Sequence, residues 1–186
     1  SGIAELNWHH PVVEFGGIEA NPKFDTLMKA VTFAREHRVD FLLAVGGGSV
    51  IDATKFISAA ANFAGDPWDI LAKGAEVTDA IEYGTVLTIP ATGSEMNCGS
   101  VISRRSINKK LAFMSEKVFP QFSILDPETT YTLPVRQVTN GVVDAFVHVM
   151  EQYLTLPQNA PIQDRFSESI LKTLIEEGYK VVENPN

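Results

Sequence analysis

Apolar positions along the chain follow two spacings in turn, and this predicts helices and strands in alternation. From Lys23 to His37, apolar residues recur every three or four positions, as on one face of a helix. The continuous apolar run Phe41–Val45 follows, which is typical of a strand buried on both faces of a parallel sheet. Three glycines lead from this run into a helix of small residues, Val50 to about Ala61. Helices and strands in such succession predict a parallel α/β sheet.

The same patterns predict the rest of the chain. Further strands are expected at Pro11–Phe15, Thr85–Ile89 and Gln121–Asp126, and an antiparallel pair at Ser100–Arg104 and Lys110–Met114. The stretch between Asn62 and Gly84 is less regular, and Trp68 is expected to pack on the core. After Pro134 only helical patterns remain, at Val135–Leu154 and Ile162–Val182. We therefore predict two domains: residues 1–132 form an α/β nucleotide-binding domain with a Rossmann-like parallel sheet, and residues 133–186 begin an all-helical domain.

The glycine run Gly46–Gly48 is the strongest signal for ligand binding. Glycine lets the main chain turn sharply and lets a ligand approach it closely. The helix that follows presents free amide groups and the positive end of its dipole, which suits a phosphate or pyrophosphate. The alternative is a tight turn with Ser49 as the helix cap. We favour binding, because three consecutive glycines exceed what a turn needs. The run matches neither of the common dinucleotide and P-loop patterns.

A second signal is the pair Asp144 and His148, which lie four residues apart on one helix face. A carboxylate and an imidazole so placed can bind one divalent ion. The spacing alone favours an ordinary Asp–His pair, because two ligands do not complete a metal site. The neighbouring residues are almost all apolar, so both groups would need a partner if they were buried, and this supports the metal interpretation.

Composition narrows the class of protein. The chain has 186 residues, 45% of them hydrophobic, and a net charge of −8, which argues against a nucleic-acid surface. Cys98 is the single cysteine, so we expect no disulfide framework and a cytoplasmic location. We expect no contact with a membrane either. We expect Cys98 to be a small side chain that fills space in the packing, rather than a reactive thiol. His9-His10 is expected to face solvent, and His37 to interact with a helix C-terminus rather than bind a metal.

Three motifs together resemble the iron-containing (group III) alcohol dehydrogenases, in the branch of NADPH-dependent butanol dehydrogenases and aldehyde reductases. The motifs are Gly46–Asp52, Thr88–Glu95 and Asn140–His148. The similarity spans nearly the whole chain, in the family's order. It implies an α/β nucleotide domain followed by an all-helical domain, hydride transfer between NADP (or NAD) and an aldehyde or alcohol, a divalent iron or zinc ion, and a homodimer.

The resemblance also implies roles for individual residues. Gly47, Gly48 and Ser49 match positions that hold the pyrophosphate, and Asp52 and Lys110 match positions at the cofactor and its ribose. The nicotinamide side is matched by Thr88, Ile89 and Asn97. The first two metal ligands of the family are matched by Asp144 and His148.

Two further histidine ligands and a first βα unit are expected in the family, and this sequence contains neither. We therefore expect an internal piece of a longer protein that is inactive by itself. Two alternatives remain open at this point. One is a dehydroquinate-synthase-like or polyol-dehydrogenase relative within the same superfamily. The other is a non-catalytic nucleotide-binding fragment.

Overall fold

The computed structural model describes residues 11–156 and 159–184. The chain divides into two compact units. The first comprises the chain up to residue 86 together with residues 93–124, and the second comprises residues 87–92 and the chain from residue 125 onward. The His9-His10 pair lies outside the described residues, so the expectation that it faces solvent stays a prediction. The domain boundary expected at residue 132 also stays a prediction.

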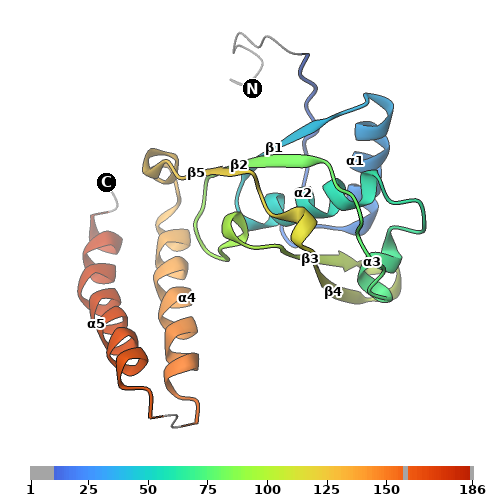
Figure 1. Cartoon of the computed structure of the whole chain (residues 1–186). Helices are drawn as coiled ribbons and strands as arrows, with labels where there is room; N and C mark the ends of the chain where they lie inside the picture. Colours follow the sequence, from blue (N-terminus) through green and yellow to red (C-terminus); the bar gives the residue numbers. More distant parts are fainter. Residues whose placement is uncertain (1–10, 157–158, 185–186) are drawn as a thin grey trace. The chain divides into compact units, whose positions relative to one another are not determined.

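The first unit is built on a three-stranded sheet with the order β1-β2-β5 (Figure 1). Its strands are β1 (Phe41–Gly46), β2 (Glu82–Leu87) and β5 (Phe122–Ile124). Strands β2 and β5 are parallel, with Gly84 opposite Phe122. Helices α1 (Phe24–Glu36) and α2 (Gly48–Ala61) pack on each other, and α2 also packs against β1. The predicted α/β class with a parallel sheet is confirmed.

A separate two-stranded sheet lies against the other side of α2. Strands β3 (Gly99–Arg104) and β4 (Lys109–Met114) pair antiparallel, with Ile102 opposite Leu111. Short 3-10 helices, η3 (Arg105–Ile107) and η4 (Glu116–Val118), flank β4, and η2 (Ser94–Met96) precedes β3. The antiparallel pair was predicted correctly.

Aromatic side chains fill the core between these elements. Phe24 of α1 lies 5.8 Å from Phe56 of α2 and 5.1 Å from Trp68, between ring centroids. Trp68 begins the five-residue helix α3 (Trp68–Ala72) and is 6% exposed, which confirms its predicted packing on the core. Burying large aromatic surfaces is the main source of stability in such a unit. The core therefore fixes α2 from both sides, and α2 carries the residues discussed below.

Two predicted features of the sheet are wrong. Residues 11–15 form no strand, because within the described residues they pair with no ladder partner, and an extended segment becomes a strand only by pairing. Strand β1 is not buried on both faces: Phe41, Leu43 and Val45 are about 40% exposed, whereas Ala44 between them is 2% exposed. In the described part of the chain, α2 covers β1 on one face and no element covers these three residues.

The second unit is helical. After η5 (Pro127–Thr130), the long helices α4 (Val135–Tyr153) and α5 (Pro161–Glu183) pack on each other (Figure 1). A Cβ atom added at Gly178 of α5 would lie 2.5 Å from Cγ1 of Val142 on α4, so the glycine allows the two helices to approach closely. No described residue of α4 is buried. Among the described residues, no helix combines the length and apolar character needed to cross a bilayer.

Candidate functional site

The glycine run leads from the end of β1 into the first turn of α2. Gly47 is the N-cap residue and no side chain caps the helix. The first backbone bonds run from Val50 and Ile51 to the carbonyl of Gly47, so the amides of Gly48 and Ser49 precede the helical ladder. The alternative in which Ser49 caps the helix is therefore wrong.

The backbone conformation of this turn does not itself demand three glycines. Gly47 has φ −86° and ψ −172°, which any residue can adopt. At Gly46 a Cβ atom would lie 2.6 Å from Cγ2 of Val50, so packing explains that glycine. The backbone dihedrals of Gly47 therefore do not account for this glycine. A requirement for close approach of a ligand to the main chain would account for it.

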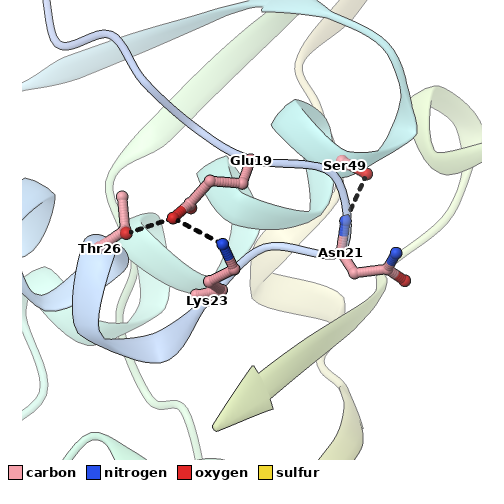
Figure 2. Close-up of polar contacts among 5 residues, drawn as sticks. All are labelled: Glu19, Asn21, Lys23, Thr26 and Ser49. Carbon is pink, nitrogen blue, oxygen red and sulfur yellow. Dashed lines mark hydrogen bonds and ion pairs between the residues drawn. The ribbon is translucent and has the colours of Figure 1, made fainter. Parts of the chain in front are cut away.

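Three polar residues meet beside the turn. The backbone N–H of Asn21 donates to Oγ of Ser49 at 3.3 Å, and Nζ of Lys110 donates to Oδ1 of the Asn21 side chain at 2.7 Å. Figure 2 shows the Asn21–Ser49 contact. Asn21 has φ 54°, a left-handed conformation that asparagine tolerates better than most residues. The structure thus brings predicted residues Ser49 and Lys110 together through Asn21. Asn21 was not predicted as a site residue, although the dipeptide Asn21-Pro22 is typical of a turn.

The segment carrying Asn21 is anchored to α1 by Glu19. Its Oε1 accepts hydrogen bonds from Nζ of Lys23 at 3.2 Å and from Oγ1 of Thr26 at 3.0 Å (Figure 2). A hydrogen bond from its own backbone, aided by Lys23 and Thr26, lowers the pKa of Glu19 against the opposing effect of burial. Glu19 therefore positions the turn as an ionised carboxylate.

Asp52 joins α2 to β3. Its Oδ2 accepts from the Val101 amide at 3.0 Å, and its backbone carbonyl accepts from Oγ of Ser100 at 2.7 Å. The other carboxylate oxygen is buried and has no hydrogen-bond partner within the described residues. These contacts give Asp52 a clear structural role next to the glycine run. The cofactor contact expected for it stays a prediction.

Asn97 lies in the connection between η2 and β3, and its side chain makes three hydrogen bonds to other residues of the first unit. Its Oδ1 accepts from Nζ of Lys55 at 2.7 Å and from the Gly99 amide at 3.0 Å, and its Nδ2 donates to the Gly93 carbonyl at 2.9 Å. Gly93 has φ 63°, so a glycine suits this turn. Lys55 was not singled out from the sequence, because a lysine on a helix is normally a surface residue.

Thr88 and Ile89 follow β2 directly and belong to the second unit. Both are partly buried. Oγ1 of Thr129 donates to the Leu87 carbonyl at 3.0 Å and so ties this segment to η5. Their predicted contact with the nicotinamide side stays a prediction.

Asp144 and His148 face the same side of α4, as their spacing predicts. Oδ2 of Asp144 lies 3.6 Å from Nε2 of His148, which is too long for a hydrogen bond. Both side chains are more than half exposed, Asp144 at 54% and His148 at 65%. The argument that both would need a partner because they are buried therefore does not apply to the described residues. Within the described residues no third histidine, cysteine or acidic residue joins them as a metal-binding group.

Two other candidates behave as expected or stay untested. Nδ1 of His37 lies 2.9 Å from the carbonyl of Phe33, and His37 is the C-cap residue of α1, which confirms its predicted interaction with a helix C-terminus. Cys98 is a free thiol of intermediate exposure. Its role as a small filler stays a prediction.

Comparison with known proteins decides the family. The profile described as iron-containing alcohol dehydrogenase matches residues 3–127. The profile of the C-terminal part of the Fe-containing alcohol dehydrogenase family matches residues 138–186. The chain belongs to the iron-containing alcohol dehydrogenase family.

Individual members of the family are closely similar in sequence. The NADPH-dependent aldehyde reductase YqhD of Escherichia coli is 62% identical over 177 residues, which are 94% of this chain and 46% of that protein. The probable NADH-dependent butanol dehydrogenase 1 of Bacillus subtilis is 50% identical over 181 residues, 97% of this chain and 47% of that protein. The chain thus spans about half the length of these relatives.

Solved structures agree with the fold. The crystal structure of E. coli K-12 YqhD superimposes with a TM-score of 0.86 at 61% identity, covering 93% of this chain and 45% of that one. NADH-dependent butanol dehydrogenase A from Thermotoga maritima gives a TM-score of 0.84 at 35% identity, covering 93% and 43%. Both support an α/β unit followed by a helical unit.

Proposed function

We propose that the intact protein is a metal-dependent alcohol dehydrogenase or aldehyde reductase, which transfers a hydride between NADP (or NAD) and a small aldehyde or primary alcohol. The observation that carries the proposal is the Asp144–His148 pair, set on a helix of a chain whose other unit carries a glycine run at a helix start. The family membership and the names of the relatives support the same activity. Those names include both NADPH- and NADH-dependent enzymes, so the cofactor's phosphate is left to experiment.

The glycine run is well suited to a dinucleotide pyrophosphate. Amides of Gly48 and Ser49 precede the helical hydrogen-bond ladder, and no side chain competes for the N-terminus of α2. An anion there gains both hydrogen bonds and the favourable end of the helix dipole. Lys110, held beside Ser49 through Asn21, adds a positive charge. These contacts support the roles proposed for Gly47, Gly48, Ser49 and Lys110.

The geometry of Asp144 and His148 fits two ligands of one divalent ion. With ligand bonds of about 2.1 Å and angles between roughly 90° and 109°, two donors on one ion lie about 3.0–3.4 Å apart. The observed 3.6 Å between Oδ2 and Nε2 is within a few tenths of an ångström of that range. A carboxylate oxygen with an imidazole nitrogen suits iron or zinc. Further ligands are needed to close such a site.

The mechanism assigns a positioning task to each group of residues. The glycine run would hold the cofactor by its pyrophosphate, while Thr88, Ile89 and Asn97 would line its nicotinamide half. Asp144 and His148 would hold the ion next to the substrate oxygen. When bound, the dinucleotide supplies the hydride for the carbonyl carbon and the ion acts as a Lewis acid on the carbonyl oxygen. No side chain of this chain acts as a nucleophile in this scheme.

The decisive experiment is aldehyde-dependent oxidation of NADPH and NADH by the intact protein, tested with butanal. We expect turnover that depends on added iron(II) or zinc. Asp144→Ala and His148→Ala should each lose bound metal and activity together, whereas Lys172→Ala, which alters only an exposed ion pair on α5, should keep both. Full metal occupancy in both ligand variants would contradict the metal assignment.

The same assay separates the alternatives. A dehydroquinate-synthase-like or polyol-dehydrogenase enzyme would leave aldehydes unreduced, and a non-catalytic nucleotide-binding protein would bind NADPH without turnover. We further propose that the intact enzyme is a cytoplasmic homodimer. The single cysteine of this chain fits a reducing compartment. The mass of the purified protein, measured by light scattering, tests the dimer.

A further inference from the structure

Lys55 is a buried lysine that the proposed mechanism does not use. It lies in the second turn of α2, and its side chain is 0% exposed. Burying an ammonium group is costly unless hydrogen bonds compensate for the lost water. Nζ of Lys55 donates to Oδ1 of Asn97 at 2.7 Å and to the Gly99 carbonyl at 2.8 Å. Burial lowers the pKa of Lys55, although the negative charge of Asp52 opposes the shift.

The contact with Lys55 is the charged one of three contacts that fix which way the Asn97 amide faces. A lysine ammonium is a donor only, so the group that it contacts must be the carbonyl oxygen of the amide and not its NH₂. The Gly99 amide, also a donor, points at the same oxygen at 3.0 Å. Nδ2 is thereby turned to the opposite side, where one of its two protons goes to the Gly93 carbonyl at 2.9 Å. One N–H of Asn97 is left over as a donor.

We propose that Lys55 is a positioning residue for the cofactor, which fixes the Asn97 amide so that its remaining N–H donates to an acceptor on the nicotinamide half of NAD(P). This inference rests on the proposed function, because it takes the cofactor contact of Asn97 from there. Without Lys55, only the Gly99 amide and the Gly93 carbonyl oppose rotation of the amide by half a turn, which presents its oxygen instead. An oxygen facing the same acceptor would repel it.

A purely structural role is the competing explanation. Lys55 joins α2 to the start of β3 through Gly99, and Asp52, one turn earlier, joins the same elements through Val101 and Ser100. If Lys55 served only this connection, its loss would lower stability without acting through Asn97. The two explanations differ in whether the effects of Lys55 and Asn97 on cofactor binding depend on each other.

The test is a double-mutant cycle on NADPH affinity in the intact protein, measured by calorimetry. Lys55→Met keeps the length of the buried chain and removes the charge and the donor. We expect it to weaken NADPH binding by up to about tenfold, the upper end of the scale for one net hydrogen bond from a neutral amide. In the Asn97→Ala background the same substitution should change affinity less than about twofold. Equal losses in both backgrounds would overturn the proposal.

Controls separate this inference from general destabilisation and from the proposed function. Arg35→Met removes three hydrogen bonds to backbone carbonyls at the other end of α2. It should lower thermal stability and leave NADPH affinity unchanged, and a tenfold loss of affinity in it would contradict the specific role of Lys55. If unmutated protein binds neither NADPH nor NADH, the proposed function fails instead; if it binds only NADH, the cycle is measured with NADH.

A measurement on unmutated protein covers the case in which Lys55→Met does not fold. The side-chain amide of Asn97 gives a pair of proton signals in ¹⁵N NMR spectra, which the Asn97→Ala spectrum identifies. Saturation with NADPH should shift these signals. Unchanged signals in a protein that binds NADPH would refute the contact and the positioning role with it.

Discussion

The close approach of α4 and α5 makes a sharp prediction about stability. A Cβ atom at Gly178 would lie 2.5 Å from Cγ1 of Val142, whereas it would lie 3.6 Å from Cβ and Cγ2 of Val142. Gly178→Ala therefore overpacks the helix interface through one methyl group, which typically costs about 1–3 kcal/mol. The same change improves helix propensity by about 1 kcal/mol. We expect a net loss of stability of about 0–2 kcal/mol.

The sign of the effect should reverse when Val142→Ala removes Cγ1 together with Cγ2. In the Val142→Ala background only the Cβ contact at 3.6 Å remains, which is an ordinary van der Waals distance. Gly178→Ala should then stabilise the protein by about 1 kcal/mol, through helix propensity alone. The coupling between the two positions is thus about 1–3 kcal/mol.

Urea unfolding of the intact protein, followed by circular dichroism, measures the four variants of this cycle. Gly141→Ala on α4 is the matched control, because a Cβ atom there would meet nothing within 4 Å. It should stabilise equally with valine or alanine at position 142. Equal effects of Gly178→Ala in both backgrounds would refute the reasoning from the interhelical contact.

Three further predictions concern the site and its surroundings. Gly48→Val should abolish NADPH binding, because its side chain blocks approach of the cofactor to the main chain at the start of α2. The thermal midpoint of unfolding should change little, and an unaltered affinity in calorimetry would contradict this interpretation. Glu19→Gln should remove part of the acid sensitivity of the fold. The folded-state pKa of Glu19 lies below its ordinary value of 4.5, so the stability it contributes is present above pH 4.5 and is lost as the pH falls through the folded pKa. The difference in urea midpoint between wild type and Glu19→Gln should therefore be larger at neutral pH than well below pH 4.5, and a difference independent of pH would count against it. The 186-residue chain by itself should not reduce butanal with NADPH, even with added iron(II) or zinc, because Asp144 and His148 are joined by no third metal-binding group within the described residues. Turnover by this chain at a rate comparable with the E. coli relative would show that the site needs no further ligands.

The elements that sequence predicts well are those with a long or unmistakable local pattern. Helices α1, α4 and α5 repeat their apolar positions over several turns, so their periodicity is strong. Helix α3 has only five residues, too few to show a period, and it was missed. Burial of β1 was predicted wrongly because exposure of Phe41 depends on what else covers the sheet, which the apolar run itself does not record.

The site divides in the same way. Asp144 and His148 were found because helix geometry alone brings residues four apart together. Asn21 lies 28 residues from Ser49, and Lys55 lies 42 residues from Asn97, so only the tertiary fold joins them. One signal for Lys55 was present: it stands between Thr54 and Phe56 in a helix of small and apolar residues, where a lysine is unexpected.

The length of α2 sets the spacing between two groups proposed to contact the cofactor. Gly48 and Ser49 at its start are the proposed pyrophosphate donors, and Lys55, which orients Asn97, follows six residues after Ser49. Six residues of α-helix advance about 9 Å along the axis. One residue inserted between Ser49 and Lys55 would move the lysine by about 1.5 Å and turn it by about 100° around the axis. Insertions or deletions between Ser49 and Lys55 should therefore be tolerated less than single substitutions, because the number of residues sets the distance from the proposed pyrophosphate site to the contact with Asn97.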